Sequence, residues 1–219
     1  MTQSAPSNDR QPEVRWPVSV VLASTIVLHL VLPERYIIGG HFAGPALELA
    51  LLLWLTALNP NYINRHTPQL RRLALAVAVA FSLINVYSVL RLVTELAVGA
   101  WTSGAPALLL TGGAIWLSNV IVTALWYWEH DRGGPAARHT GSDAHPSFLF
   151  PQMASPEFAP SNWRPTFFDY LYLSFTNASA FSPTDVLPLK RWAKMLMMAQ
   201  SALSLMTLAM VIARAINTL

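Results

Sequence analysis

Apolar residues follow one another along this chain in long blocks, separated by shorter polar stretches. A helix needs about 20 mostly apolar residues to cross the hydrocarbon core of a bilayer. Five blocks approach or exceed that length, after a polar tail at residues 1–15. The pattern therefore predicts five transmembrane helices, at residues 16–32, 37–58, 73–98, 106–128 and 192–217.

A sixth apolar block, Thr166–Ala180, is too short to cross the membrane, because 15 helical residues reach only about 22 Å. Thr166 and Asp169 have the spacing of a capping box, which predicts a helix start. Ser182 precedes a proline, which favours extended backbone and predicts the helix end. Residues 129–165, rich in Pro and Gly, come before this block. We predict a re-entrant helix, whose turn at membrane depth must be sheltered by protein or face a wet cavity.

Composition supports a membrane protein over a soluble one. Of the 219 residues, 53% are hydrophobic and 11% charged, against roughly 25% charged in soluble domains. The mean hydropathy is +0.40. The chain has no Cys, which excludes thiolate catalysis and Cys-ligated metals. Signatures of zinc proteases, serine hydrolases and phosphate-binding loops are missing from the sequence. We therefore expect no enzyme and no cofactor.

Residues 170–188 read YLYLSFTNASAFSPTDVLP. This stretch resembles the pore helix, filter and following turn of the potassium-channel pore-loop superfamily. Without gaps, Tyr172, Ser174 and Phe175 fall on the pore helix, and Asp185 on the Asp that closes the filter. The layout is also similar to an uncharacterised family of bacterial multi-pass membrane proteins with the motif Phe168–Thr176, for which no activity is established. The resemblance implies an all-α integral membrane protein whose pore-loop-like unit spans residues 166–219.

The filter itself differs from that family. Ser182 and Thr184 replace its two glycines, and Pro183 lies between them. Potassium selectivity requires a ring of backbone carbonyls, which glycine presents easily and proline restricts. We expect an ion-channel-like protein that discriminates potassium poorly if it conducts. Since one loop supplies only part of a filter, we expect a homo-oligomer and an inorganic cation as ligand. The resemblance places these residues at the pore or its mouth: Thr176, Asn177, Ser179, Ser182, Thr184 and Asp185.

Three charged residues fall inside the second and third predicted spans. Glu48 lies near the middle of the second span, and Arg91 and Glu95 near the end of the third. Buried charges in a membrane are costly and mark functional candidates. Alternation of the spans predicts a Glu48–Arg91 ion pair, which either fixes helix register or relays protons or ions. Two alternatives to a channel therefore remain: a non-conducting scaffold with a pore-like fold, and a proton- or ion-coupled transporter using Glu48 and Arg91.

Other polar residues have less specific interpretations. Asn85 and Asn119, near the middles of two spans, are predicted to bond across helices. A small-residue face on the last span fits either pore lining or close helix packing; it comprises Ala199, Ala202, Met206, Ala209 and Ala213. A further set in the long loop matches no defined metal site, and we predict solvated loop residues there: His130, Asp131, His139, Asp143 and His145.

The positive charge of the chain is better explained by topology than by nucleic acid. The net charge is +3, and the 14 Lys and Arg residues are spread along the sequence. With five spans, most of them fall on the side of the N-terminus. Positive residues favour the cytoplasm, so we predict a cytoplasmic N-terminus and an external C-terminus. The resemblance to the bacterial multi-pass family implies a protein of the bacterial inner membrane. The channel resemblance implies the reverse orientation.

Overall fold

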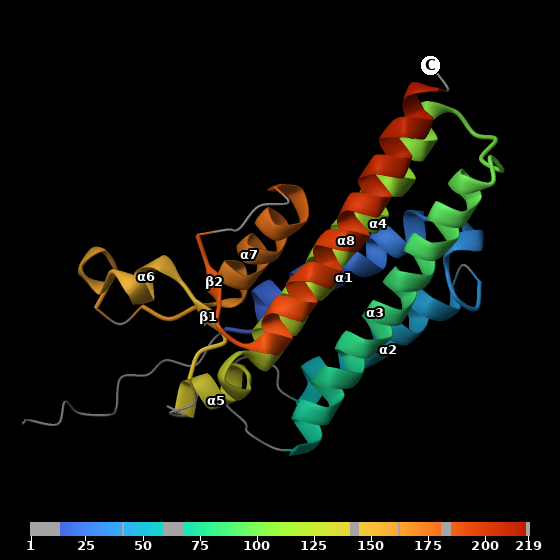
Figure 1. The fold of residues 1–219 in the computed structure, drawn as a ribbon. Coiled ribbons are helices and arrows are strands. Elements are labelled where there is room, and N and C mark those ends of the chain that lie inside the picture. The colour runs from blue at the N-terminus through green and yellow to red at the C-terminus, as the bar shows by residue number, and fades with distance from the viewer. Residues whose placement is uncertain are drawn as a thin grey trace, which may run out of the picture.

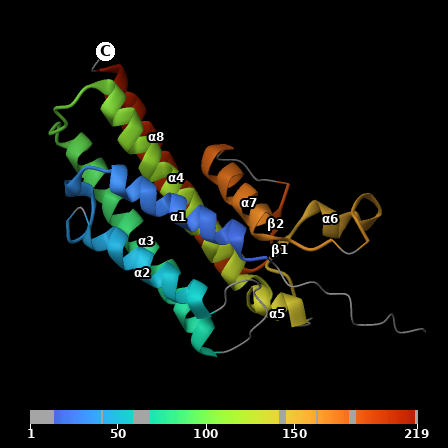
Figure 2. The same ribbon diagram turned by 180° about the vertical axis from the view of Figure 1, so that it is seen from behind.

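The computed structural model describes residues 14–40, 42–58, 68–140, 145–161, 163–180 and 185–217. Within these residues, five long helices lie side by side and form a mostly helical bundle (Figures 1 and 2). They are α1 (Trp16–Val31), α2 (Ala43–Leu58), α3 (Pro68–Ala97), α4 (Ala105–His130) and α8 (Arg191–Ile216).

Three of these helices, α3, α4 and α8, are long and apolar enough to cross a membrane. The other two, α1 and α2, are apolar but only 16 residues long. The prediction for residues 37–58 is wrong in its first part, because α2 begins only at Ala43. Gly39 and Gly40 precede it with φ of 79° and 92°, a left-handed conformation that interrupts a helix. A short helix, η1 (Glu34–Tyr36), leads from α1 into this turn.

Between α4 and α8 the chain forms several short elements at one end of the bundle. Helix α7 leads away from that end, and β2 lies there again. β1 pairs antiparallel with β2, with Phe148 opposite Pro188. The N–H of Leu189 donates to the carbonyl of Ser147 at 2.8 Å. The elements are η2 (Asp131–Gly133), α5 (Pro135–Thr140), β1 (Phe148–Leu149), α6 (Pro151–Ala154), η3 (Pro156–Phe158), α7 (Phe167–Ala180) and β2 (Leu187–Pro188).

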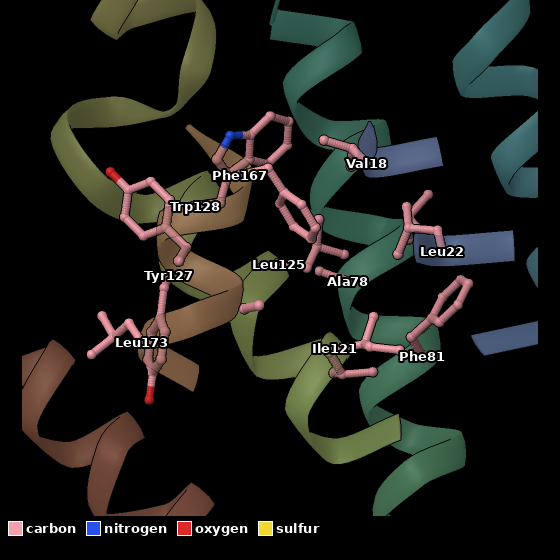
Figure 3. Close-up of a cluster of buried hydrophobic side chains, with 14 of the residues drawn as sticks. Val18, Leu22, Ala78, Phe81, Ile121, Leu125, Tyr127, Trp128, Phe167 and Leu173 are labelled. Carbon is pink, nitrogen blue, oxygen red and sulfur yellow. The ribbon is translucent and has the colours of Figure 1, made fainter. Parts of the chain in front are cut away.

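Helix α4 forms the centre of the bundle and packs against α1, α3, α7 and α8. In its most apolar segment 72% of the residues are buried, against 28% in α8. Figure 3 shows part of the core, in which Leu22 of α1 and Phe81 of α3 lie near Ile121 of α4. Helices α1, α3, α7 and α8 can therefore be placed by their contacts with α4.

Close packing of α4 against α8 depends on a missing side chain at Gly112. A Cβ there would lie 2.6 Å from a methyl group of Val211, whereas a Cβ on Gly113 would meet nothing within 4 Å. Overpacking costs about 1–3 kcal/mol, while Ala stabilises a helix by about 1 kcal/mol over Gly. We expect Gly112→Ala to lower the unfolding free energy and the matched Gly113→Ala to preserve or raise it. Thermal unfolding in detergent measures both; equal effects would contradict this packing.

Candidate functional site

The short helix α7 begins where the sequence predicts. The backbone N–H and the hydroxyl of Thr166 donate to Asp169 Oδ2 at 2.7 and 2.8 Å. These bonds satisfy groups that a helix start leaves unpaired. The bond from the Thr166 N–H to Asp169 is one half of the predicted capping box, and α7 starts at Phe167.

The Gln200 side chain joins α7 to both neighbouring helices. Its Nε2 donates to the carbonyl of Ser174 at 2.9 Å and to the Ser174 hydroxyl at 2.6 Å. Its Oε1 accepts from the Tyr127 hydroxyl and from Asn177 Nδ2, both at 2.8 Å. Gln200 is 2% exposed, and Ser174 and Tyr127 are fully buried. One amide on α8 therefore bonds to α4 and to two turns of α7.

Further hydrogen bonds extend this polar contact. The Ser174 hydroxyl donates to the Val120 carbonyl of α4 at 2.6 Å. Asn119 Nδ2 donates to Ser204 Oγ at 3.0 Å, and Asn85 Nδ2 donates to the Ile115 carbonyl at 3.0 Å. The prediction that Asn85 and Asn119 bond across helices is confirmed.

The residues predicted to line a pore have different surroundings. Asn177 is buried and also donates to the Met197 carbonyl of α8, so it packs between helices. Thr176 and Ser179 donate their hydroxyls to carbonyls of α7 itself. Asp185 is exposed and lies two residues before β2. Ser182 and Thr184 lie outside the described residues.

Helix α7 ends near the middle of α8. Ser201 donates its hydroxyl to the Asn177 carbonyl at 3.3 Å. Ser201 lies ten residues after the start of α8 at Arg191, about 15 Å along the helix axis. This is about half of a 30 Å hydrocarbon core. The chain therefore enters beside the start of α8, reaches half its length and returns to pair β2 with β1.

Two faces of this unit remain uncovered in the single chain. On α7 the exposed side chains are Phe168, Tyr172, Phe175 and Ser179, which recur at helical spacing. On α8 the predicted small-residue face is exposed along its length: Ala199, Ala202, Met206, Ala209 and Ala213. The described residues of this chain therefore do not cover this face.

A second buried polar cluster anchors the start of α7 to the end of α4. Asp131 is 0% exposed. Its Oδ2 accepts from the Tyr170 hydroxyl at 2.7 Å, and its Oδ1 accepts from the Ser147 N–H at 2.6 Å. The guanidinium of Arg138 lies 5.2 Å from the Tyr170 ring centroid and donates to the Asp131 carbonyl at 2.9 Å.

The prediction of a solvated loop is therefore wrong for Asp131. His130 is half-buried. Its ring centroid lies 4.9 Å from that of Trp126 and 5.5 Å from that of Trp192. His145 is exposed, as predicted. Asp143 lies outside the described residues, as does the side chain of His139.

With this geometry in hand, the chain was compared with known proteins. No family model, curated protein or solved structure matches it. The functional argument therefore rests on the residues and their contacts.

The predicted Glu48–Arg91 pair is wrong. Glu48 Oε2 instead lies 2.9 Å from Nδ1 of His29, and both side chains are 0% exposed. Arg91 is exposed and donates through Nε to the Arg35 carbonyl at 3.4 Å. Alternation of the spans places His29, Glu48 and Arg91 toward the same end of the bundle. The rotation of α3 about its own axis, however, directs Arg91 outward.

Glu95 takes part in a separate cluster at the α1–α2 connection. Arg35 lies 3.2 Å from its Oε1, and the Tyr36 hydroxyl donates to its Oε2. Burial, reinforced by the bond to Glu95, raises the pKa of Tyr36 to about 12. Tyr36 therefore remains a hydrogen-bond donor at physiological pH. Glu95 is thus paired outside the bundle core rather than with Arg91.

The sequence interpretation missed Gln200, Tyr127 and the structural role of Ser174. The available signal was a single amide in the apolar stretch MLMMAQSALSL. A buried amide in an apolar span requires partners, but the spacing does not say which helices provide them.

Replacing Gln200 with Leu should release α7 from its neighbours. The change leaves the Tyr127 hydroxyl without its partner and removes one hydrogen bond each from Asn177 and the Ser174 carbonyl. A buried group left unpaired costs about 1–3 kcal/mol. Interhelical bonds in membranes are weaker on average, so we expect a total loss of about 1–3 kcal/mol. Thr207→Val is the matched control, because Thr207 is equally buried but bonds only to Leu203 of its own helix. Thermal unfolding and proteolysis near α7 should respond to Gln200→Leu alone; equal responses would rule out this role.

Proposed function

We propose that the protein is an oligomeric, ion-channel-like membrane protein with five transmembrane helices, in which α7 is a re-entrant pore-type helix. The observation that supports this best is the docked α7, which ends halfway along α8. The return to β2 at the starting side gives the path expected of a pore loop. The sequence resemblance at residues 170–188 supports the same interpretation.

The exposed surfaces favour five spans. Large apolar side chains are exposed on the two shorter helices, including Val20 and Val27 of α1 and Leu49 and Leu53 of α2. Sixteen residues reach about 24 Å, and a short helix can thin the bilayer locally at modest cost. Lipid would cover these side chains if α1 and α2 span together with α3, α4 and α8.

The small-residue face of α8 supports an oligomer. Small residues allow helix backbones to approach closely in membranes, and this face is uncovered in one chain. It lies on α8, the helix that follows the return segment, by which we mean the chain between α7 and α8. Several copies would therefore bring their α8 helices and return segments around one axis. The last turn of α7 directs its partial negative charge toward a cation in that arrangement.

Selectivity should be poor in this proposal, because Ser182, Pro183 and Thr184 replace the glycine-rich filter of the resembled family. Asp185 would then provide the main attraction for cations. It is an exposed carboxylate on the return segment, and a ring of such groups raises the local cation concentration.

The membrane path of α7 can be tested by cysteine labelling, since the chain has no Cys. Three exposed residues provide single sites: Glu157→Cys before α7, Asp185→Cys after it and Asn217→Cys after α8. With a cytoplasmic N-terminus, an impermeant maleimide applied to intact cells should label only Asn217→Cys. The other two should react together after permeabilisation.

Two other results have definite meanings. If Glu157→Cys and Asp185→Cys react from opposite sides, α7 crosses the membrane and the re-entrant proposal fails. If both react in intact cells while Asn217→Cys does not, α7 is still re-entrant but the orientation is reversed. That outcome would favour the orientation implied by the channel resemblance.

Conduction is tested by flux into liposomes that contain the purified protein. We expect similar rates for potassium and sodium, and a several-fold decrease for Asp185→Asn. Glu157→Gln, an exposed carboxylate outside the return segment, is the matched control and should leave the flux unchanged. A strong potassium preference would refute the filter argument. Absence of flux from folded protein would refute conduction.

A further inference from the structure

His29 and Glu48 form an isolated polar pair in the helix bundle. His29 lies in the last turn of α1, and Glu48 lies in the second turn of α2. Nδ1 and Oε2 are 2.9 Å apart, and both side chains are 0% exposed. The Phe81 ring of α3 lies against the imidazole, with 6.4 Å between centroids. The pair is thus removed from water and held between three helices.

Each member has one polar atom without a partner. Within the described residues, neither His29 Nε2 nor Glu48 Oε1 has a hydrogen-bond partner, although both are buried. Buried polar atoms are rarely left unpaired. If the pair only fixed helix register, it would be most stable with every one of its polar atoms hydrogen-bonded. The unused atoms therefore require another explanation.

The surrounding helices supply no further charge to the pair. Glu48 is the only titratable residue of α2. The charged and titratable residues of α3 are Arg71, Arg72, Tyr87, Arg91 and Glu95; those of α4 are Tyr127, Glu129 and His130; those of α7 are Asp169, Tyr170 and Tyr172. In the described part of the chain none of them forms a hydrogen bond or ion pair with His29 or Glu48, and Arg91 and Glu95 bind near Arg35. The charge of the pair is therefore set by its own protons.

We propose that His29 and Glu48 form a proton-binding site in which His29 Nε2 takes up and releases the proton. The charged imidazole carries protons on both nitrogens and faces the carboxylate, so the pair is neutral. Release of the Nε2 proton to water leaves a neutral ring that still donates Nδ1–H to Glu48 Oε2. The pair then carries one negative charge.

The position of the site gives the proton a short route. His29 is two residues from the end of α1 and Glu48 five residues from the start of α2, about 3 and 8 Å along the helix axes. Opening the α1–α2 contact at this end would admit water to Nε2. This site is independent of the proposed conduction, since a protein that conducts no ions can still bind the proton.

The test is nitrogen NMR of the full chain in lipid nanodiscs, with ¹⁵N-labelled His29 as the sole imidazole. The five other histidines are replaced by Gln: His41, His66, His130, His139 and His145. Between about pH 5 and about pH 9, the range in which histidine usually titrates, Nε2 should lose its proton reversibly while Nδ1 keeps its own. Adding Glu48→Gln should abolish the charged form of the ring, because burial without a carboxylate favours neutral imidazole. Glu95→Gln, which removes another bundle carboxylate, should leave the titration unchanged.

The proposal fails if Nε2 keeps one protonation state throughout this range, or if it titrates identically with Glu48→Gln. The first result needs no change at Glu48, so the test remains decisive even if Glu48→Gln does not fold. Failure of cation flux in liposomes would leave the NMR outcome unaffected. The proton site and the proposed conduction are therefore judged separately.

Discussion

A single buried amide organises the packing of α7 and α8 against α4. Gln200 uses both ends of its side chain, donating to Ser174 and accepting from Tyr127 and Asn177. In an apolar bundle an unpaired amide is costly, so the position of α7 and the rotation of α8 must satisfy it together. This constraint buries one face of α8 against α4 and α7. It consequently leaves the small-residue face of α8 on the outside.

The same rule explains how the described part of the connection after α4 is held in place despite its many prolines. Asp131 is buried at the end of α4 and accepts from Tyr170 of α7 and from the backbone of Ser147. Ser147 precedes β1, which pairs with β2 on the return path. The entry and the exit of α7 are therefore fixed at one place, while Gln200 fixes its middle. The short helix α7 is therefore held at its start and at its middle by buried polar groups.

Hydrophobic blocks and turn chemistry predicted much of the fold from the sequence. The bounds of α1, α4, α7 and α8 agree with the expected ranges to within two residues, because block length and capping residues are local properties. Partner choice is not local. The Glu48–Arg91 pair was wrong because spacing along a helix gives the level of a side chain but not its rotation toward a neighbour. Asp131 looked like a solvated residue for a related reason, since its partners Tyr170 and Ser147 are distant in the sequence.

The Gln200 site and the His29–Glu48 pair differ in how many of their polar atoms are hydrogen-bonded. This difference distinguishes a structural role from a chemical one. Gln200 has partners on both of its polar atoms, and it has no proton to exchange near neutral pH, so it can only hold helices in place. His29 and Glu48 satisfy one atom each, and the described residues offer no partner to Nε2 and Oε1. A titratable pair with spare capacity can change its charge while keeping the bond that positions it. Sequence alone would rank a buried Glu above a buried Gln as a functional residue, and the contacts supply the physical reason for that ranking here.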